Sequence, residues 1–443
     1  MDPRAFLVEE CKSVRVALNE TLRHDYGPER SRLYFEECKV RLQVVEQALV
    51  DSPDMDRETI AAHMRGLSAL GSRISLIERS HLGEFSWPFA AIIEQVAERL
   101  FVEKSLDGDM EPIVHVVAEG TDYQIVDDEV PPPGNRRIII VAFPRQLKHH
   151  VLLHVIFGHE LAHTAINAEG PGALMKTSVL PLAGYGPLQD GIQASAWLRR
   201  DDAPPSVRAM AEKPGFTFQE QWLVNWRQEI ICDLFGLMLF GPAFAAAHRT
   251  IIEALCPRPD AFDLESTTHP PYPIRQKILA AATRDRGWDA PITTEEDGVA
   301  HAAERSLLGY VTEAIDQPWF EIFDAGRIKE ILDALAQVLA PYELGYVPPD
   351  RAMFCELLRR LSQERPPIWQ VVDEEGVPTN HPVSGAHSLY AGWSYWFGRA
   401  ALAEEARQQD PRVQELSFLE LNQLCDQALL QQRAIDLVGE APQ

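Results

Sequence analysis

Apolar residues follow a helical period over most of the first hundred residues. They recur at spacings of three and four in four segments, 8–22, 31–50, 57–79 and 88–102. This spacing predicts four amphipathic helices, each with one apolar face. Turn-forming stretches, Tyr26-Gly27-Pro28 and Asp51-Ser52-Pro53-Asp54, separate the first three helices. We therefore expect residues 1–108 to form a helical bundle or an array of helical hairpins.

The period then changes from helical to strand-like. Short β-rich runs cover 113–117, 123–126 and 138–143, and Pro144 closes the last of them. Helical spacing resumes directly afterwards and predicts one helix from about Arg145 to Ile166. The sequence thus predicts a small sheet that leads into a long helix.

A long segment without periodicity follows. Residues 168–215 are rich in Gly, Pro, Ser and Ala, which favours either a lid or rim over a cleft or a disordered surface loop. A helix is expected from about residue 217, and the apolar run 230–247 reads as a buried helix. Further helices are expected at 300–315, 325–339, 351–361, 384–406 and 418–437.

These elements predict a predominantly helical α+β protein with three regions. Residues 1–108 form an N-terminal helical region, residues 109–290 form a core with the insertion 168–215, and residues 291–443 form a C-terminal helical region. A chain of 443 residues exceeds one ordinary hydrophobic core, so more than one domain is expected.

Composition narrows the class of function. The formal charge of −25 argues against a nucleic-acid partner, because binding phosphates needs a concentrated basic face. No window of about 18 apolar residues occurs, so no membrane span is expected. The N-terminal residues lack the pattern of a signal peptide, and the six cysteines are scattered. Together these features predict free thiols and a cytoplasmic protein.

The motif His-Glu-x-x-His lies within the helix predicted after the strands. Because His159 and His163 are four residues apart, a helix places both imidazoles on one face, where they can bind one zinc ion. Glu160, beside them, can reach a water on the metal. The alternative is a helix whose histidines are merely packed or solvated. The presence of a third ligand decides between the two readings.

The best candidate for that ligand lies about 65 residues further on. Glu229 and Asp233 are spaced i, i+4 in an otherwise apolar helix, where carboxylates are costly unless paired or bound to a metal. We expect Glu229 to be the third zinc ligand. Asp233 would accept a hydrogen bond from the far ring nitrogen of either histidine. The alternative is a carboxylate pair that forms salt bridges with Arg227 or Arg275.

The combination resembles a known family. His159-Glu160-x-x-His163 followed by Glu229-x-x-x-Asp233 is similar to the gluzincin zinc proteases. The segment 266–271, Ser-Thr-Thr-His-Pro-Pro, and Arg275 resemble the HtpX-like and CAAX-prenyl-protease-like branch, over about residues 137–285. This resemblance implies a zincin-like core of a small sheet, the motif helix and a glutamate-bearing helix. Many enzymes of that branch are integral membrane proteins, whereas this chain has no predicted span, so membrane substrates are not implied.

A mechanism follows from these residues. Zinc would lower the pKa of a bound water to about 7, and Glu160 would take its proton and pass it to the leaving amine. The oxyanion needs a second donor besides zinc. His269 is the first candidate, with Tyr272 and Arg275 behind it. The alternative for His269 is packing in a Pro-rich turn.

The sequence therefore predicts a zinc metalloendopeptidase with one Zn²⁺ per chain that acts on a protein or peptide. The helical flanks are expected to select the substrate or a regulatory protein partner. Two alternatives remain open at this point: a metal-dependent amidohydrolase acting on a small substrate, and a catalytically silent helical scaffold that keeps the fold for binding. The intact Glu160 speaks against the scaffold, because a retired enzyme need not keep its base.

Overall fold

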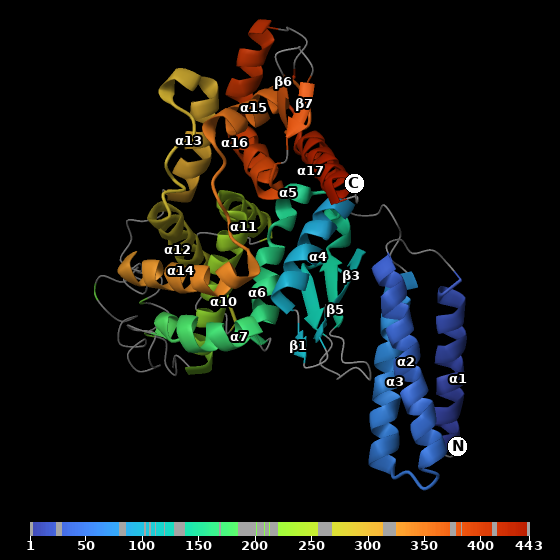
Figure 1. Ribbon diagram of the computed structural model, residues 1–443. Helices are drawn as coiled ribbons and strands as arrows, with labels where there is room; N and C mark the ends of the chain where they lie inside the picture. Colours follow the sequence, from blue (N-terminus) through green and yellow to red (C-terminus); the bar gives the residue numbers. More distant parts are fainter. Residues whose placement is uncertain are drawn as a thin grey trace. The chain divides into compact units, whose positions relative to one another are not determined.

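A computed structural model shows a predominantly helical chain with one three-stranded sheet and two short two-stranded sheets among the residues it describes (Figure 1). The predicted α+β class is confirmed at this level. The described residues are 3–23, 29–78, 86–101, 103–105, 108–110, 112–118, 120–127, 138–167, 170–184, 201, 208, 212, 220–255, 268–312, 325–372, 378–381, 383–409 and 414–440.

The chain divides into two compact units. The first comprises residues 1–86 and 94–148, and the second comprises residues 87–93 and 149–443. Helix α4 (Trp87–Phe101) contributes to both units. The three sequence regions 1–108, 109–290 and 291–443 remain a prediction about domains.

The first unit contains three long helices, α1 (Pro3–Thr21), α2 (Glu29–Asp51) and α3 (Arg57–Glu78). The helical pattern predicted these segments to within two residues, except that α1 begins five residues earlier. In α1 the buried apolar side chains recur at helical spacing and turn one face toward α2 and α3. They are Leu7, Cys11, Val14 and Leu18.

A three-stranded sheet belongs to the same unit, in the order β3-β5-β4. Its strands are β3 (Ile113–Ala118), β4 (Gln124–Asp127) and β5 (Ile138–Phe143). The central β5 runs parallel to β3 and antiparallel to β4, with Ile113 opposite Ile138. All six residues of β3 are buried, as expected for a strand that is covered on both faces. The sequence predicted these three strands, but it missed the short antiparallel pair β1 (Glu103–Ser105) and β2 (Gly108–Met110).

The segment 145–167, which begins in the first unit and continues in the second, differs from the prediction. The single helix predicted from Arg145 to Ile166 is broken into a 3₁₀ turn η1 (Arg145–Leu147), the short helix α5 (Val151–His154) and α6 (Phe157–Asn167). Hydrogen bonds from residue i to i−3 close the chain between α5 and α6, among them Gly158 N to Val155 O at 3.0 Å. The apolar spacing continues across this break because both sides are buried, so periodicity alone could not reveal it.

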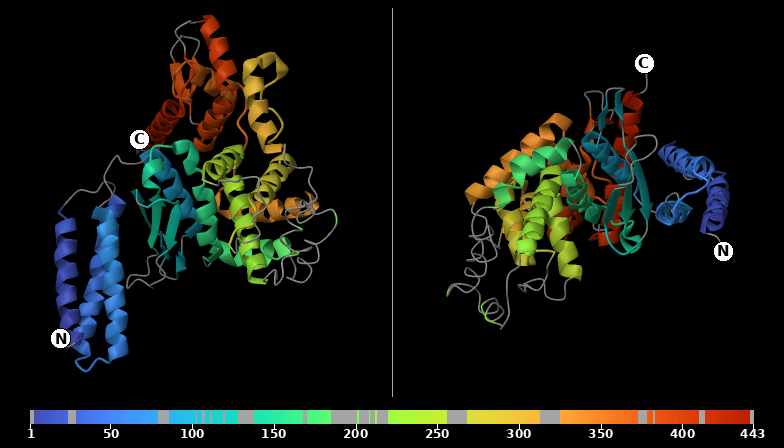
Figure 2. Two further views of the ribbon diagram at one scale, coloured as in Figure 1. Left: turned by 180° about the vertical axis from the view of Figure 1, so that it is seen from behind. Right: turned by 90° about the horizontal axis from the view of Figure 1, so that it is seen from below.

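Helices α10 (Glu220–Phe240), α11 (Pro242–Leu255) and α12 (Tyr272–Asp285) form the middle of the second unit. The apolar run 230–247 is not one helix. It is divided at Gly241, whose φ of 60° lies in the left-handed region that glycine tolerates, before Pro242 opens α11. Helix α10 packs against α6, α11 and α12, and these helices lie side by side in both orientations of Figure 2.

Part of the predicted insertion belongs to the core. Helix α7 (Gly170–Leu174), the π-helical turn η2 (Met175–Val179) and the 3₁₀ turn η3 (Leu182–Gly184) follow α6, and Met175, Val179 and Ala183 are fully buried. Residues 170–184 therefore form helical turns with buried side chains and not a loose loop. Nearly all of the rest of 168–215 lies outside the described residues.

The C-terminal part of the second unit is helical, as predicted, except for one hairpin. Helix α16 packs against α13, α15 and α17, whereas α14 packs against α12 and α10 (Figure 1). The hairpin was not predicted, since neither strand alternates clearly in polarity. These elements are α13 (Val299–Thr312), α14 (Ala325–Leu339), 3₁₀ turn η7 (Ala340–Tyr342), α15 (Arg351–Ser362), β6 (Trp369–Val372), β7 (Pro378–His381), α16 (Gly385–Gln409) and α17 (Phe418–Glu440), with the 3₁₀ turn η5 (Glu295–Asp297) before α13.

Helices α6 and α10 cross at unusually close range. A Cβ atom added to Gly158 in α6 would lie 2.8 Å from Cα of Gly236 in α10 and 3.1 Å from the ring of Phe240. A Cβ on Gly236 would lie 2.3 Å from a ring carbon of Phe244 in α11. Gly158 thus allows α6 to lie directly against the backbone of α10, and Gly236 leaves room for the ring of Phe244.

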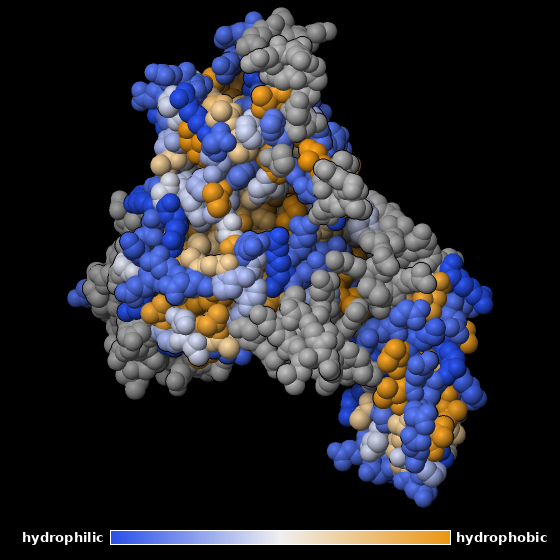
Figure 3. All heavy atoms as spheres, viewed as in Figure 1, coloured by the Kyte–Doolittle hydropathy of each residue, from blue (hydrophilic) through white to orange (hydrophobic). Residues whose placement is uncertain are grey.

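The described helices include none with both the length and the apolar character needed to cross a bilayer. Figure 3 shows hydrophilic residues over much of the described surface in that view, with apolar residues interspersed on the N-terminal helices. The described cysteines are all free thiols, in agreement with the prediction; they are Cys11, Cys38, Cys232, Cys355 and Cys425.

His115 in β3 gives the first unit a pH-dependent stability. Burial lowers the pKa of His115 to about 4 from its ordinary 6.5, so folding favours the neutral ring. The unfolded chain binds this proton first as the pH falls. Stability is therefore complete above pH 6.5 and decreases toward pH 4, by at most about 3 kcal/mol for this group.

Hydrogen exchange of the β3 and β5 amides, measured from pH 7 to pH 4, checks this expectation. His115→Leu should reduce the loss of protection relative to wild type, because leucine cannot be protonated. The difference between the two proteins isolates His115 from the carboxylates that titrate in the same range. Parallel curves for both proteins would contradict a neutral buried histidine.

The helix crossing predicts a large effect of one methyl group. Gly158→Ala should destabilise the second unit by about 1–3 kcal/mol, because the backbone of α10 must move to admit the Cβ. All nine tryptophans lie in this unit, so urea unfolding followed by tryptophan fluorescence reports on it alone. Gly66→Ala in α3 is the control for a methyl group at an open helical position, since nothing lies within 4 Å of it; because α3 belongs to the first unit, its unfolding is followed by circular dichroism. A Gly158→Ala midpoint equal to wild type would refute the close crossing.

Candidate metal centre

Three predicted ligands meet in the second unit. Nε2 of His159 lies 3.1 Å from Nε2 of His163 and 3.2 Å from Oε2 of Glu229, and Nε2 of His163 lies 3.2 Å from Oε1 of Glu229. The potential ligand atoms of these residues all fall within 4.8 Å of one another. No other such cluster of three His, Cys, Asp or Glu residues occurs in the described part of the chain.

These distances fit one metal ion. Ligand atoms bound to a tetrahedral zinc at about 2.0–2.1 Å lie about 3.3 Å apart, close to the separations found here. In addition, Oε2 of Glu229 is buried and makes no hydrogen bond within the described residues. A buried carboxylate oxygen without a hydrogen bond is costly, and a cation between the three side chains would satisfy it. The donor set of two imidazoles and one carboxylate is one that zinc accepts.

Two helices supply all three side chains. The i, i+4 spacing on α6 projects both imidazoles from one face, and Glu229 projects from α10, which crosses that face. The close contact between Gly158 and Gly236 holds the two helices at the short distance that these side chains can bridge. His159 directly follows Gly158, so the crossing and the cluster are coupled in sequence as well as in space.

Asp233 lies behind the cluster, where the sequence analysis placed it. Its Oδ1 lies 2.9 Å from Nδ1 of His159, and it accepts two hydrogen bonds from Arg275, Nε to Oδ2 at 2.7 Å and NH2 to Oδ1 at 2.6 Å. Asp233 therefore combines both roles that were considered, the histidine partner and the arginine salt bridge. Arg275 also lies 3.8 Å from Glu229, so the two carboxylates share one guanidinium.

The electrostatics of the cluster favour a cation. Burial alone lowers the pKa of His159, but its contacts with Asp233 and Glu229 outweigh this and raise the pKa to about 9. Burial raises the pKa of Asp233, yet Arg275 and the neighbouring histidines hold it well below its usual range. The site thus contains two carboxylates that remain ionised.

Glu160 is half-buried beside the two histidines. Burial raises the pKa of its carboxyl group, which the neighbouring His159 and His163 partly counteract. A carboxylate with a raised pKa next to a metal site can accept a proton and release it again. The position therefore suits the general base that the motif predicted.

His269 lies at the edge of the cluster. Its Nε2 is 3.3 Å from Oε2 of Glu229, its Nδ1 is 2.8 Å from Oγ1 of Thr268, and its side chain is 49% exposed. Tyr272, at the start of α12, lies with its ring centre 6.0 Å from the guanidinium carbon of Arg275. His269 thus lies beside a candidate ligand, and Tyr272 lies beside Arg275. Burial lowers the pKa of His269, and the positive charges of Arg275 and His159 lower it further.

Three further residues near the cluster were not predicted. His248 on α11 is buried, with Nε2 at 3.4 Å from Oδ1 of Asp233 and Nδ1 at 2.6 Å from Nε2 of Gln276. Nε2 of Gln228 lies 3.3 Å from Nδ1 of His163. Only the position of Gln228 next to Glu229 could have drawn attention to it. Nothing in the sequence links α11 to the motif.

Two other histidines shortly before the motif have packing positions. His154 in α5 is buried, and its ring centre lies 5.4 Å from that of Phe89. The ring of His150 stacks on Phe418 at 5.8 Å. Neither belongs to the metal-binding cluster.

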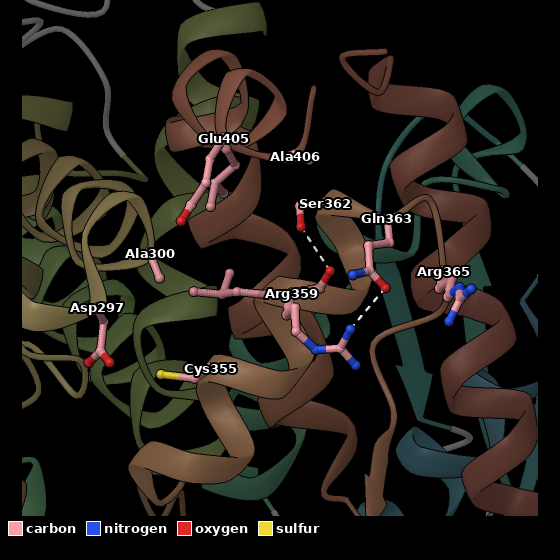
Figure 4. A pocket seen from close by; sticks show the side chains of 11 residues that line it. Asp297, Ala300, Cys355, Arg359, Ser362, Gln363, Arg365, Glu405 and Ala406 are labelled. Carbon is pink, nitrogen blue, oxygen red and sulfur yellow. Dashed lines mark hydrogen bonds between the residues drawn. The ribbon is translucent and has the colours of Figure 1, made fainter. Parts of the chain in front are cut away.

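A cavity elsewhere in the second unit is distinct from this centre. It has a volume of about 480 Å³, and residues near and within α13, α15 and α16 line it (Figure 4). Several of its charged groups already form hydrogen bonds. Arg351 donates to Asp297, and Arg359 donates to Glu356 and Gln363. None of the candidate metal ligands lies among its lining residues.

Comparison with known proteins gives no match to a family model, to a curated protein or to a solved structure. The function is therefore inferred from the geometry and chemistry of these residues.

Proposed function

We propose that this chain is a zinc-dependent metallopeptidase that hydrolyses peptide bonds in a protein substrate. The observation that carries the proposal is the His159, His163 and Glu229 cluster, whose ligand atoms are spaced as on a tetrahedral zinc. A metal site with three protein ligands keeps one position for water or substrate, which is the arrangement of catalytic rather than structural zinc.

In this proposal the two imidazoles bind through Nε2 and Glu229 binds through its carboxylate. Asp233 accepts a hydrogen bond from Nδ1 of His159 and so directs Nε2 toward the metal. Zinc, when bound, would supply Lewis acidity, polarising the substrate carbonyl and making a water more acidic.

Glu160 acts as the proton carrier. Its carboxylate accepts the proton of the attacking water and transfers it to the nitrogen of the leaving amine. Its raised pKa reduces the difference in proton affinity between the carboxylate and these groups, which favours transfer in both directions. Loss of this carboxylate should stop hydrolysis without removing a metal ligand.

His269 is placed to donate to the oxyanion that forms on the substrate. It is the exposed histidine at the edge of the cluster, within reach of a group bound between the ligands and solvent. Arg275 is hydrogen-bonded to Asp233 and is therefore a positioning residue in this proposal. Tyr272 lies beside Arg275 and is a weaker candidate for the second donor.

The proposal also includes a zincin-like core of the gluzincin type, similar to the HtpX-like branch. Support comes from the order of the motif helix and the Glu229-x-x-x-Asp233 helix, and from Arg275 bonding the aspartate. We further propose a cytoplasmic enzyme whose N- and C-terminal helices select the protein substrate or a regulatory partner. Truncating either helical region without any change in substrate preference would argue against that selection.

The metal content of purified protein tests the centre. Wild type should bind one zinc per chain, and Glu229→Ala should lose it or bind it far more weakly, because one of three ligands is gone. Glu160→Gln should retain the zinc. Atomic absorption after dialysis measures all three proteins. If wild type binds no zinc after the metal is supplied, the proposed function is wrong and a binding protein becomes the better account.

Hydrolysis tests the assignment of the base. Glu160→Gln should lower cleavage of unfolded casein at least about 100-fold, since general-base catalysis typically contributes 10²–10⁴-fold. Gel electrophoresis and mass spectrometry of the products provide the measurement, with Glu405→Gln, the same chemical change at an exposed position of α16, as the control. Equal rates for wild type and Glu160→Gln would show that the observed cleavage does not come from this site.

A further inference from the structure

Each imidazole of the cluster has its own partner on α10. Nδ1 of His159 faces the carboxylate of Asp233 at 2.9 Å, and Nδ1 of His163 faces the side-chain amide of Gln228 at 3.3 Å. The two partners differ in chemistry. Asp233 is a buried anion that Arg275 holds in place, whereas Gln228 is neutral and half-buried.

This difference matters because the proton of an imidazole must occupy the nitrogen that does not bind the metal. Nε2 of His163 lies 3.2 Å from Oε1 of Glu229, and this contact is a hydrogen bond when Nε2 carries the proton. Nδ1 is then an acceptor, and the Nε2 amide group of Gln228 at 3.3 Å donates to it. With the proton on Nε2, His163 thus donates a hydrogen bond to Glu229 and accepts one from Gln228.

The roles would be reversed in the proposed zinc-bound state. With Nε2 of His163 as a ligand, the ring proton would have to be on Nδ1, which would then be a donor and need an acceptor. The amide of Gln228 can provide one, because a half-turn about its last side-chain bond exchanges the NH₂ group for the carbonyl oxygen. An ionised carboxylate in place of Gln228 could pair only with a protonated Nδ1, since it accepts hydrogen bonds but cannot donate them.

We propose that Gln228 is a positioning residue that sets the tautomer of His163 and so controls how tightly this ligand binds the metal. The inference depends on the proposed zinc centre and adds to it a ligand-specific role that the histidine–glutamate motif does not contain. The asymmetry makes His163 the more replaceable ligand. Its side chain is 31% exposed and has a neutral partner, while that of His159 is 6% exposed and has an anionic one.

Substitution of Gln228 separates hydrogen bonding from packing. Gln228→Met keeps the length of the side chain but removes both donor and acceptor, so zinc affinity should fall about 10–100-fold, as for other outer partners of metal-binding histidines. Gln228→Glu restores the acceptor and should bind zinc at least as tightly as wild type. Competition with a chromogenic chelator measures the dissociation constants, using Zn²⁺ alone as the ligand.

Val224→Glu controls for added charge. Val224 lies one turn before Gln228 on α10 and is 46% exposed. A carboxylate there adds the same charge to the same helix, one turn closer to its N-terminus. Its affinity should stay near wild type. If Val224→Glu tightens zinc binding as much as Gln228→Glu, long-range charge explains the gain and the rescue by an acceptor is refuted.

Nuclear magnetic resonance of zinc-loaded protein labelled at histidine nitrogen provides a second readout. In wild type, His163 should carry its proton on Nδ1, and that proton should exchange slowly. In Gln228→Met the same proton should exchange faster, although the fold, monitored by tryptophan fluorescence, is unchanged. Equal zinc affinities and equal exchange rates in both proteins would overturn the role of Gln228. Absence of zinc binding in wild type would instead overturn the metal centre itself.

Discussion

Two buried carboxylates on α10 are the constraint on which the centre of the second unit depends. Glu229 and Asp233 are almost inaccessible to water, and an uncompensated buried charge costs several kcal/mol. One guanidinium cannot compensate two anions in full. Arg275 forms both of its short hydrogen bonds with Asp233 and lies only within 3.8 Å of Glu229. The remaining negative charge belongs to Glu229, where the two imidazoles converge.

This residual charge explains why the cluster favours a cation. The carboxylates raise the pKa of His159 although the ring is buried, which means that the site stabilises positive charge even against desolvation. A divalent ion bound by the same atoms would satisfy Oε2 of Glu229 at the same time. The chemistry of the site thus follows from where α10 has its carboxylates and not from the two histidines alone.

The sequence predicted those features that depend on local spacing. The i, i+4 histidines, the apolar context that made Glu229 and Asp233 conspicuous, and most helices and strands all follow from periodicity. Arg275 was named twice, as a possible salt-bridge partner of these carboxylates and through the resemblance to a family. What spacing could not predict depends on contacts between distant segments: the break before α6, the division of 230–247, and the position of His248 on α11. The burial of 170–184 was missed because small and polar residues do not indicate which neighbours will cover them.

The direction from which a substrate can approach follows from the uneven exposure of the cluster. On the side of Asp233 the site is closed, because Asp233, Arg275 and His248 are buried and in contact with one another. Exposure increases toward His163 and His269, whose side chains are 31% and 49% accessible. A fourth position on a metal bound here must therefore open toward these two residues. In the proposed centre His163 is therefore the ligand nearest to solvent, where a neutral partner such as Gln228, able both to donate and to accept, would have the greatest influence on metal binding.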